Sequence, residues 1–285
     1  MQQNGFTLKL NNTRLTILAS VLCVLITLIF SHRAYSKTYA QTNTQTNTQT
    51  NTQAKAQTIT LAVGHDHQSM LENRYDIYKA NWDALKMGLE DMGHKLKASA
   101  APWARAKAYV QSGKLDGLFI AARLPKRDKW AEFTDTIGYE IYGFFERQNF
   151  VPPAQIYAGI RLGGEDRVLS YIPPEKLLYV PTAQRGLELL NQGKVDRFAM
   201  SYGYGEYLLK TELKDFKSNI KFNPSESETR SLHIAVSKRH PNKTQVLNIL
   251  NKAIAHSIAK GYYQAAMEKN KVPKRMWVHS VASIN

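Results

Sequence analysis

Two histidines flank an aspartate directly after the first apolar strand of the sequence, where polar side chains could do chemistry. His65, Asp66 and His67 are adjacent, and adjacent positions on one loop rarely converge on a single ion. No further cluster of Cys or His accompanies them. We therefore expect no metal here. We predict instead that His65 or Asp66 lines a ligand crevice, because strand ends in α/β sheets border such crevices.

A glycine pair offers a different kind of site. Gly163 and Gly164 follow the predicted strand Tyr157–Leu162. If a helix begins there, the backbone N–H groups exposed by the two glycines can hold an anion. A simple turn explains the same pair equally well.

The sequence carries no pattern for covalent or redox catalysis. Its single cysteine, Cys23, lies in an apolar N-terminal run, so neither a disulfide nor a reactive thiol is expected in the folded part. No nucleophile–base pair and no Gly-x-Ser-x-Gly motif stands out. We predict no catalytic residues and no cofactor.

The elements that must position these residues alternate between strand and helix. Ile59–Val63 is a short β-branched apolar strand, and Leu115–Ala121 is a second buried strand. Between them, apolar residues at helical spacing predict helices over Asn81–Met92 and Ala104–Gln111. This alternation predicts a largely parallel sheet.

The second half of the chain repeats this arrangement. Strands are predicted over Tyr157–Leu162, Leu177–Val180 and Val195–Met200, and a helix over Ala183–Asn191. The two halves share a Gly-Lys pair, an aliphatic residue and an aspartate before an apolar strand, in QSGKLDGLFI and NQGKVDRFAM. We infer two similar α/β lobes. The remaining predicted elements are one strand and two helices: Leu232–Val236, Thr244–Ala259 and Tyr262–Glu268.

The N-terminus predicts export to the periplasm. Lys9 and Arg14 precede the uncharged apolar run Leu15–Phe30, which is the pattern of a secretory signal peptide. The run is shorter than the roughly 20 residues of a typical transmembrane helix. Small residues would permit cleavage after Ser36 or Ala40. The alternative is an uncleaved anchor in the inner membrane.

A low-complexity tract separates this segment from the folded part. We assign residues 1–36 to the signal peptide or anchor and residues 37–56 to a tether. The tract QTNTQTNTQTNTQ contains no apolar residue to bury, so we expect it to be disordered. Such a tether would let a folded domain stand off a membrane, although a neutral repeat expansion is the alternative.

The formal net charge of +15 allows an anionic partner. The basic residues are nevertheless scattered, and no standard nucleic-acid-binding motif is visible. We therefore expect no nucleic-acid partner. A basic surface without any charge-specific partner is the simpler interpretation.

With these elements in order, residues 57–280 resemble the family 3 solute-binding proteins, the polar amino-acid receptors of ABC importers and their relatives. The most specific stretch runs from Trp103 to Gly138 and contains GKLDGLFIAARLPKRDKWAEFTDTIG. LHIAVSK, at Leu232–Lys238, and the helices after it look like the return crossover of the family. The resemblance implies an α/β fold, namely a two-lobed periplasmic binding protein type II-like fold with a two-segment hinge.

This resemblance also implies a division into lobes. Lobe 1 would comprise residues 57–145 plus 236–285, and lobe 2 residues 146–235. The hinge would lie near Phe144–Gln148 and Leu232–Val236. Proteins of this kind close around a ligand that contacts both lobes.

The resemblance implies three ligand contacts in the first lobe. Arg127 matches the family arginine whose planar guanidinium makes two parallel hydrogen bonds to a ligand carboxylate. The alternative is that Arg127 is simply one of several charged residues in a solvent-exposed run. Arg123 falls near a ligand-touching position, where a second cation would favour a dianionic or larger acidic solute. Trp103 begins a helix that faces the cleft in the family, so its ring either stacks on the ligand or packs against Pro102 and the core.

The second lobe departs from the family pattern at one position. Amino-acid receptors of this family carry an aspartate where this chain has Ser201, and that carboxylate pairs with the ammonium group of the ligand. We expect Ser201 and the adjacent Tyr202 to contact the ligand. The missing acid implies that the solute need not be an α-amino acid.

The residues and the resemblance together predict an extracytoplasmic solute-binding protein rather than an enzyme. It would close around a small polar, anionic ligand for ABC-type uptake or for sensing. The expected partners are that ligand and an ABC permease or membrane sensor; we expect a monomer that meets the membrane only through its N-terminus. The alternatives are a dehydratase-like envelope enzyme on the same scaffold and a membrane-anchored sensory module without transport.

Overall fold

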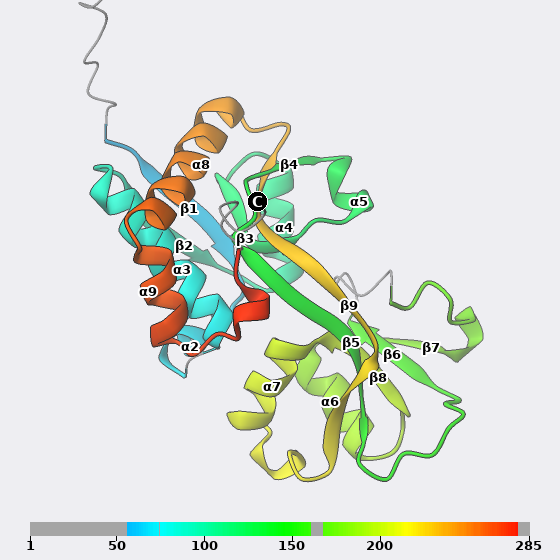
Figure 1. Ribbon diagram of the computed structural model, residues 1–285. Coiled ribbons are helices and arrows are strands. Elements are labelled where there is room, and N and C mark those ends of the chain that lie inside the picture. Colours follow the sequence, from blue (N-terminus) through cyan, green and yellow to red (C-terminus); the bar gives the residue numbers. More distant parts are fainter. Residues whose placement is uncertain (1–55, 74, 161–167, 279–285) are drawn as a thin grey trace, which may run out of the picture. The chain divides into compact units, whose positions relative to one another are not determined.

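One mixed β-sheet runs through the part of the chain that the computed structural model describes, residues 56–73, 75–160 and 168–278. Its strand order is β2-β1-β3-β9-β5-β8-β6-β7, and β4 pairs with β9 outside this path (Figure 1). The predicted signal segment and almost all of the tether lie outside the described residues, as do Gly163 and Gly164.

Two groups of parallel strands lie at the two ends of this sheet. In the first group β1 pairs with β2 and β3; their bounds are Thr58–Val63, Lys95–Ala100 and Gly117–Ala122. In the second group β6 pairs with β7 and β8; their bounds are Tyr157–Ile160, Leu177–Val180 and Arg197–Ser201. Each parallel group forms the sheet of one lobe.

Two long antiparallel strands, β5 (Gly138–Arg147) and β9 (Ile220–Ser237), join the groups. Leu232–Val236 of β9 pairs with β3 and with the short strand β4 (Ala131–Phe133), and Leu232 also pairs with β5. Tyr142–Glu146 of β5 pairs with β8. Between these stretches, β5 and β9 pair with each other, and there they cross from one lobe to the other. This topology confirms the predicted two-lobed fold with two crossing segments; the exact domain boundaries stay predictions.

Helices cover the sheet and complete the first lobe from the C-terminal part of the chain. α3 packs against both α8 and α9, as Figure 1 shows. The helices are α2 His67–Glu72, α3 Asp76–Asp91, α4 Trp103–Gln111, α5 Pro125–Asp128, α6 Ala183–Asn191, α7 Tyr202–Lys210, α8 Lys243–Ala259 and α9 Tyr262–Lys269. The 3-10 turns are η2 Pro174–Lys176, η3 Lys214–Phe216 and η4 Lys274–Met276. Among these described helices, none has the length and apolar composition that a membrane span requires.

The repeated Gly-Lys-x-Asp segments have the same geometry in both lobes. Gly113 and Gly193 follow the ends of α4 and α6 with positive φ angles of 79° and 73°, the left-handed conformation that glycine adopts after a helix. Asp116 then accepts a hydrogen bond from the backbone of β1 at 2.6 Å, and Asp196 accepts one from the residue before β6 at 3.0 Å. Each aspartate thus ties two neighbouring parallel strands together, and the sequence repeat reflects a structural repeat.

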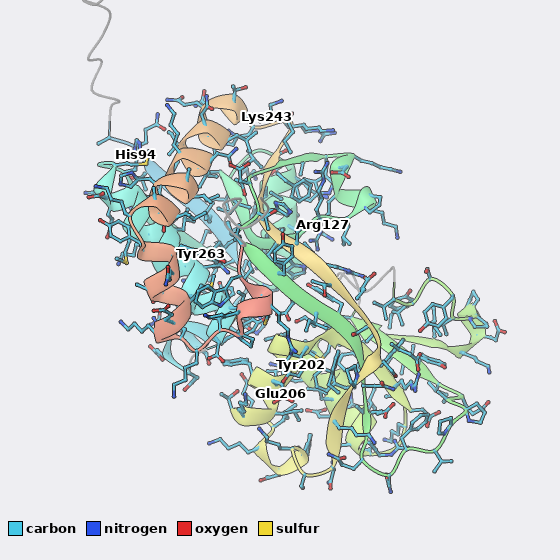
Figure 2. The ribbon with its side chains drawn as sticks, viewed as in Figure 1. His94, Arg127, Tyr202, Glu206, Lys243 and Tyr263 are labelled. Atoms are coloured by element: carbon cyan, nitrogen blue, oxygen red, sulfur yellow. The ribbon has the colours of Figure 1, made fainter. Side chains whose placement is uncertain are left out.

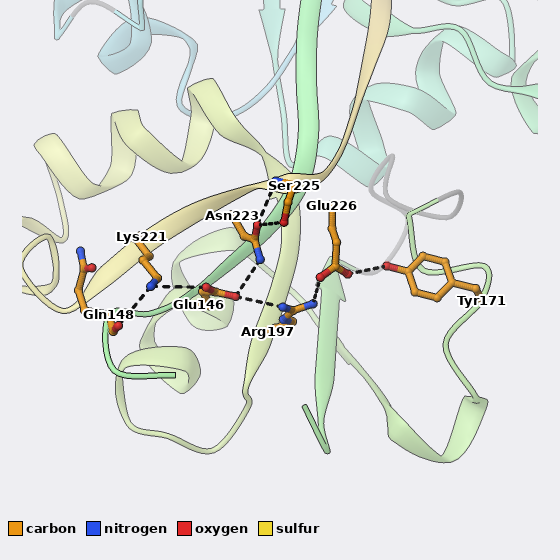
Figure 3. Close-up of polar contacts among 8 residues, drawn as sticks. All are labelled: Glu146, Gln148, Tyr171, Arg197, Lys221, Asn223, Ser225 and Glu226. Atoms are coloured by element: carbon orange, nitrogen blue, oxygen red, sulfur yellow. Dashed lines mark hydrogen bonds and ion pairs between the residues drawn. The ribbon is translucent and has the colours of Figure 1, made fainter. Parts of the chain in front are cut away.

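An ion-pair network holds β5, β8 and β9 together in the second lobe (Figure 3). Arg197 of β8 is 8% exposed; its guanidinium donates to Glu226 at 2.6 Å and lies 3.3 Å from Glu146. Lys221 lies 3.7 Å from the same Glu146 carboxylate. Because Glu146 is buried, these cations offset the desolvation of its charge. The network anchors β8, from whose end α7 begins.

Candidate functional site

Four polar side chains lie on one face of the crossing strands, and we call them the polar stripe: Glu140, Tyr142, Glu228 and Arg230. Glu140 is paired with Arg230 and Tyr142 with Glu228. Directly paired residues in antiparallel strands point to the same face. Glu140 is 2% exposed and Arg230 is 5% exposed. Burying such charged groups destabilises a protein unless each finds a hydrogen-bonding partner. The partners of Glu140 and Arg230 therefore show whether the stripe has capacity left to bind a ligand.

Arg230 is only partly satisfied by its neighbours. Its Nε donates to the Glu228 carboxylate, which Nη2 also contacts, and the guanidinium lies 4.4 Å from the centroid of the Tyr142 ring. Nη1 and Nη2 are nevertheless buried without an acceptor in hydrogen-bonding geometry. A buried donor left unpaired destabilises the fold by about 1–3 kcal/mol. The guanidinium fork is therefore poised to take an acceptor from a ligand.

Glu140 is a buried carboxylate held by neutral donors. Its Oε2 accepts from the Tyr75 hydroxyl at 2.6 Å, and its Oε1 accepts from the N–H groups of Ile141 at 2.9 Å and Gly203 at 3.3 Å. Burial raises the pKa of Glu140, and these three hydrogen bonds oppose that rise. Within the described residues no ion pair joins Glu140 to Arg230. A carboxylate accepts about four hydrogen bonds, so Oε2 keeps one acceptor position.

Gly203 allows the start of α7 to approach this carboxylate. A Cβ atom at Gly203 would lie 2.7 Å from Oε2 of Glu140 and 2.8 Å from the Tyr75 ring. Both distances are too short for any side chain, so only glycine permits this approach. Ser201, which is buried, ends β8 opposite Tyr142. The β8–α7 junction therefore belongs to the same site as the polar stripe.

Tyrosine hydroxyls connect α7 in the second lobe with the segment after β1 in the first. The Tyr204 hydroxyl donates to Asp66 at 2.6 Å, and the Tyr207 and Ser69 hydroxyls are 2.7 Å apart. Burial raises the pKa of Tyr204 and the nearby Asp66 raises it further, so the hydroxyl stays protonated and donates. The ring of Tyr75 lies 6.0 Å from that of Tyr204. Asp66, which the sequence placed at a crevice, thus lies where the two lobes meet.

The two predicted arginine contacts differ in their surroundings. Arg127 in α5 is 6% exposed, and its Nη1 donates to the carbonyl of Ala122 at 2.6 Å. Figure 2 shows it at the end of the crossing strands nearest α5. Arg123 is exposed, pairs with Asp128 at 3.1 Å and lies 5.7 Å from the centroid of the Phe133 ring. The structure therefore places Arg127 in the interior and Arg123 on the surface.

The remaining predicted residues have other packing partners. Trp103 packs against a small apolar cluster that includes Ala106 and Leu118. Tyr202 packs on Phe222 with ring centroids 5.1 Å apart. His65 is exposed. In the described ranges, no group of three or more His, Cys, Asp or Glu residues could hold a metal ion.

Sequence reasoning missed the residues that make the most contacts in this site. Glu140, Arg230 and Tyr75 were not among the predicted contacts. One signal was present: ETRSLHIAVS places Glu228 and Arg230 two positions apart, directly before an apolar strand. Charged residues at alternate positions of one strand share a face, and this face is the buried one.

Comparisons with known proteins identify the fold. No family model and no curated protein matches the chain. A histidine kinase sensor domain with similarity to periplasmic binding proteins superposes with a TM-score of 0.62 at 20% identity, covering 74% of this chain and 95% of that one. The solute receptor for L-cysteine of Neisseria gonorrhoeae gives 0.58 at 19% identity, covering 78% and 96%.

A third solved structure agrees with these two. An arginine transport system periplasmic binding protein from Legionella pneumophila gives a TM-score of 0.61 at 13% identity, covering 75% of this chain and all of that one. All three matches span nearly the whole length of the solved chains and both lobes of this one. The chain therefore has the two-lobed α/β fold of the periplasmic binding proteins.

Proposed function

We propose that this protein is an extracytoplasmic solute-binding protein whose lobes close around a small polar solute at the polar stripe. The observation that carries this proposal is Arg230, whose Nη1 and Nη2 are buried without an acceptor in hydrogen-bonding geometry. A carboxylate matches the planar guanidinium fork in both shape and charge. The solute would therefore present a carboxylate to Arg230.

Glu140 supplies an acid near Ser201, the position where this chain lacks the aspartate of the family pattern. Ser201 carries no charge, but Gly203, two residues later, donates its N–H to Glu140. A carboxylate from β5 thus lies beside the start of α7 and can accept from an ammonium group. We propose that the solute carries both a carboxylate and an amine, as an amino acid does. A purely anionic solute would bring a like charge toward Glu140, which is unfavourable.

Contacts from both lobes would surround such a solute. Asp66 and Tyr204 already bond across the two lobes, so they would line the closed site. Arg127 stays a proposed second cation on the basis of the family resemblance, and Gly163 and Gly164 stay proposed backbone donors. A ligand that contacts both lobes favours the closed arrangement by its differential affinity.

Binding rather than catalysis is the proposed role, and it serves uptake or sensing equally. The structures with this fold include receptors of transport systems and a kinase sensor domain. The extracytoplasmic location rests on the predicted N-terminal signal segment. Either role requires a solute that stabilises the folded, closed protein.

A thermal-shift screen of the purified protein tests this function. The panel contains amino acids, dicarboxylates, sugar acids and polyamines, each at millimolar concentration. A solute present at 100 times its dissociation constant adds about 2.7 kcal/mol of stability, or roughly 5–10 °C in Tm for a domain of this size. We expect such a shift with one or more zwitterionic amino acids. Stabilisation by polyamines alone, or by no member of the panel, would contradict the proposal.

A further inference from the structure

A cavity, which we call the back pocket, lies between α7 and the second-lobe part of β9. Its volume is about 580 Å³, within the range of about 300–1,000 Å³ for small-molecule sites. Ile141 of β5 lines it, whereas Glu140 and Tyr142 on either side belong to the polar stripe. Successive strand residues point to opposite faces. Ile141 therefore points away from the face that carries the polar stripe.

One wall of the back pocket is aromatic. Tyr202, the first residue of α7, and Phe222 of β9 both line it, and their ring centroids are 5.1 Å apart with an angle of 59° between the rings. Phe222 is held from behind by Phe145 at 5.2 Å between centroids. A supported aromatic wall favours contact with a flat, apolar ligand body. Figure 2 shows Tyr202 and Glu206 together on α7.

The rest of the lining is mainly cationic. Lys217, Lys221 and Arg275 line the pocket, and Glu206 is the acid among its lining residues. Lys217 lies 3.8 Å from Glu206, and Lys221 donates to the carbonyl of Gln148 at 3.2 Å. The lining residues, three cations and one acid, carry an excess of two positive charges; Lys221 also pairs at 3.7 Å with Glu146, a carboxylate that Arg197 shares at 3.3 Å. A ligand carrying two negative charges would balance them.

Arg275 is the cation most available to a ligand. It lies in η4, after α9, whereas the other three charged lining residues belong to the α7–β9 region. It is exposed, and it makes neither a hydrogen bond nor an ion pair within the part of the chain that the structure describes. Its guanidinium fork can therefore turn onto an anionic group at little cost in existing contacts.

We propose that the back pocket binds a small aromatic dianion, with the ring against Tyr202 and Phe222 and one anionic group on Arg275. This ligand differs from the zwitterionic solute of the polar stripe in both charge and shape. β5 contributes to both sites, with Ile141 in the back pocket and Glu140 in the polar stripe.

Isothermal titration with phthalate, an aromatic dicarboxylate, tests the proposal on the full protein. Succinate carries the same charge without a ring, and benzoate carries the ring with one charge. We expect phthalate to bind at least tenfold more tightly than either. Arg275→Gln should weaken phthalate binding by tenfold or more, and it should leave the fold intact because the side chain is exposed.

Two control variants separate this site from its alternatives. Lys210→Gln removes a cation that pairs with Glu206 at 3.8 Å but does not line the pocket, and we expect it to change phthalate affinity less than twofold. Arg230→Lys alters the polar stripe and should also leave phthalate binding unchanged. The proposal is overturned if phthalate does not bind the wild type, if Lys210→Gln weakens binding as much as Arg275→Gln, or if Arg230→Lys abolishes it.

Discussion

Arg230→Lys is expected to weaken binding of the stabilising amino acid by about 10- to 100-fold, which corresponds to the loss of one charge-assisted bond. Lysine keeps the positive charge beside Glu228 but cannot present two parallel N–H groups to a carboxylate. The acid is therefore still compensated and the protein should fold, while the fork that recognises the solute is lost. Isothermal titration of the wild type and the variant measures the difference.

The matched control is Arg185→Lys. Arg185 pairs with Glu188 at 2.9 Å on the exposed face of α6, and exposed pairs of this kind contribute less than about 1 kcal/mol. This variant should bind like the wild type. Wild-type affinity in Arg230→Lys, with its Tm unchanged, would remove Arg230 from the site.

Glu140→Gln is expected to stabilise the protein at alkaline pH and to weaken binding of amine-bearing solutes. Burial raises the pKa of Glu140 above its ordinary value of 4.5, so the buried charge is unfavourable in the folded state. Glutamine has the same shape and can accept from the two backbone N–H groups with its oxygen. We expect a gain of about 1 kcal/mol or more at pH 8, measured by urea denaturation.

The pH dependence of this gain has a definite sign. As pH rises from 4.5 through the raised pKa of Glu140, the folded wild type binds more protons than the unfolded chain, so its stability falls. Glutamine does not titrate, so the advantage of the variant grows over the same window and is smallest near pH 4. Burial also lowers the pKa of His67 and of His233. Both histidines are present in the wild type and in the variant, so their effects cancel in the difference in unfolding free energy.

Binding to Glu140→Gln separates the two charges of the solute. An amino acid should lose about tenfold or more in affinity, because the amine loses its charged acceptor. A carboxylate-bearing solute without an amine should lose little, since Arg230 is intact. Glu188→Gln, which replaces a half-buried acid on α6 that pairs with Arg185, should change stability by less than about 1 kcal/mol and leave binding unchanged. A Glu140→Gln protein that is less stable than the wild type at pH 8 and binds normally would show that Glu140 is structural only.

Local patterns predicted most of the parallel strands of this fold, although not β2. The strand Leu177–Val180 and the helix Ala183–Asn191 have the predicted bounds, because each is defined by its own apolar spacing and by the turn residues that end it. The Gly-Lys-x-Asp repeat predicted two similar lobes for the same reason. Its glycine ends a helix and its aspartate ties two strands, and both effects act within one lobe.

Elements that depend on distant partners were not predicted. β9 was expected over Leu232–Val236 but begins at Ile220, because its polar first half is held by pairing with β5 rather than by its own hydrophobicity. α7 was not predicted because YGYGEYLLK contains two glycines, which disfavour helix. Gly203 is required by the approach to Glu140. At Gly205, a Cβ atom would lie 2.2 Å from the Phe145 ring.

The same reason explains what was missed in the site. The family resemblance pointed to Arg127 because this residue lies within one continuous stretch of matching sequence. The pairing of Glu140 with Arg230 joins residues 90 positions apart, and only the register of the crossing strands brings them to one face. That register depends on the fold as a whole, so single-sequence patterns could not provide it.

Hydrogen exchange of the protein with and without its stabilising amino acid tests the central claim most directly. A solute bound at the polar stripe would slow local opening of the elements that contact it. We predict added protection in peptides that contain Tyr75, Glu140, Gly203 and Arg230, from both lobes at once. Protection confined to one lobe, or to α8 and α9 away from the crossing strands, would contradict a solute site between the lobes.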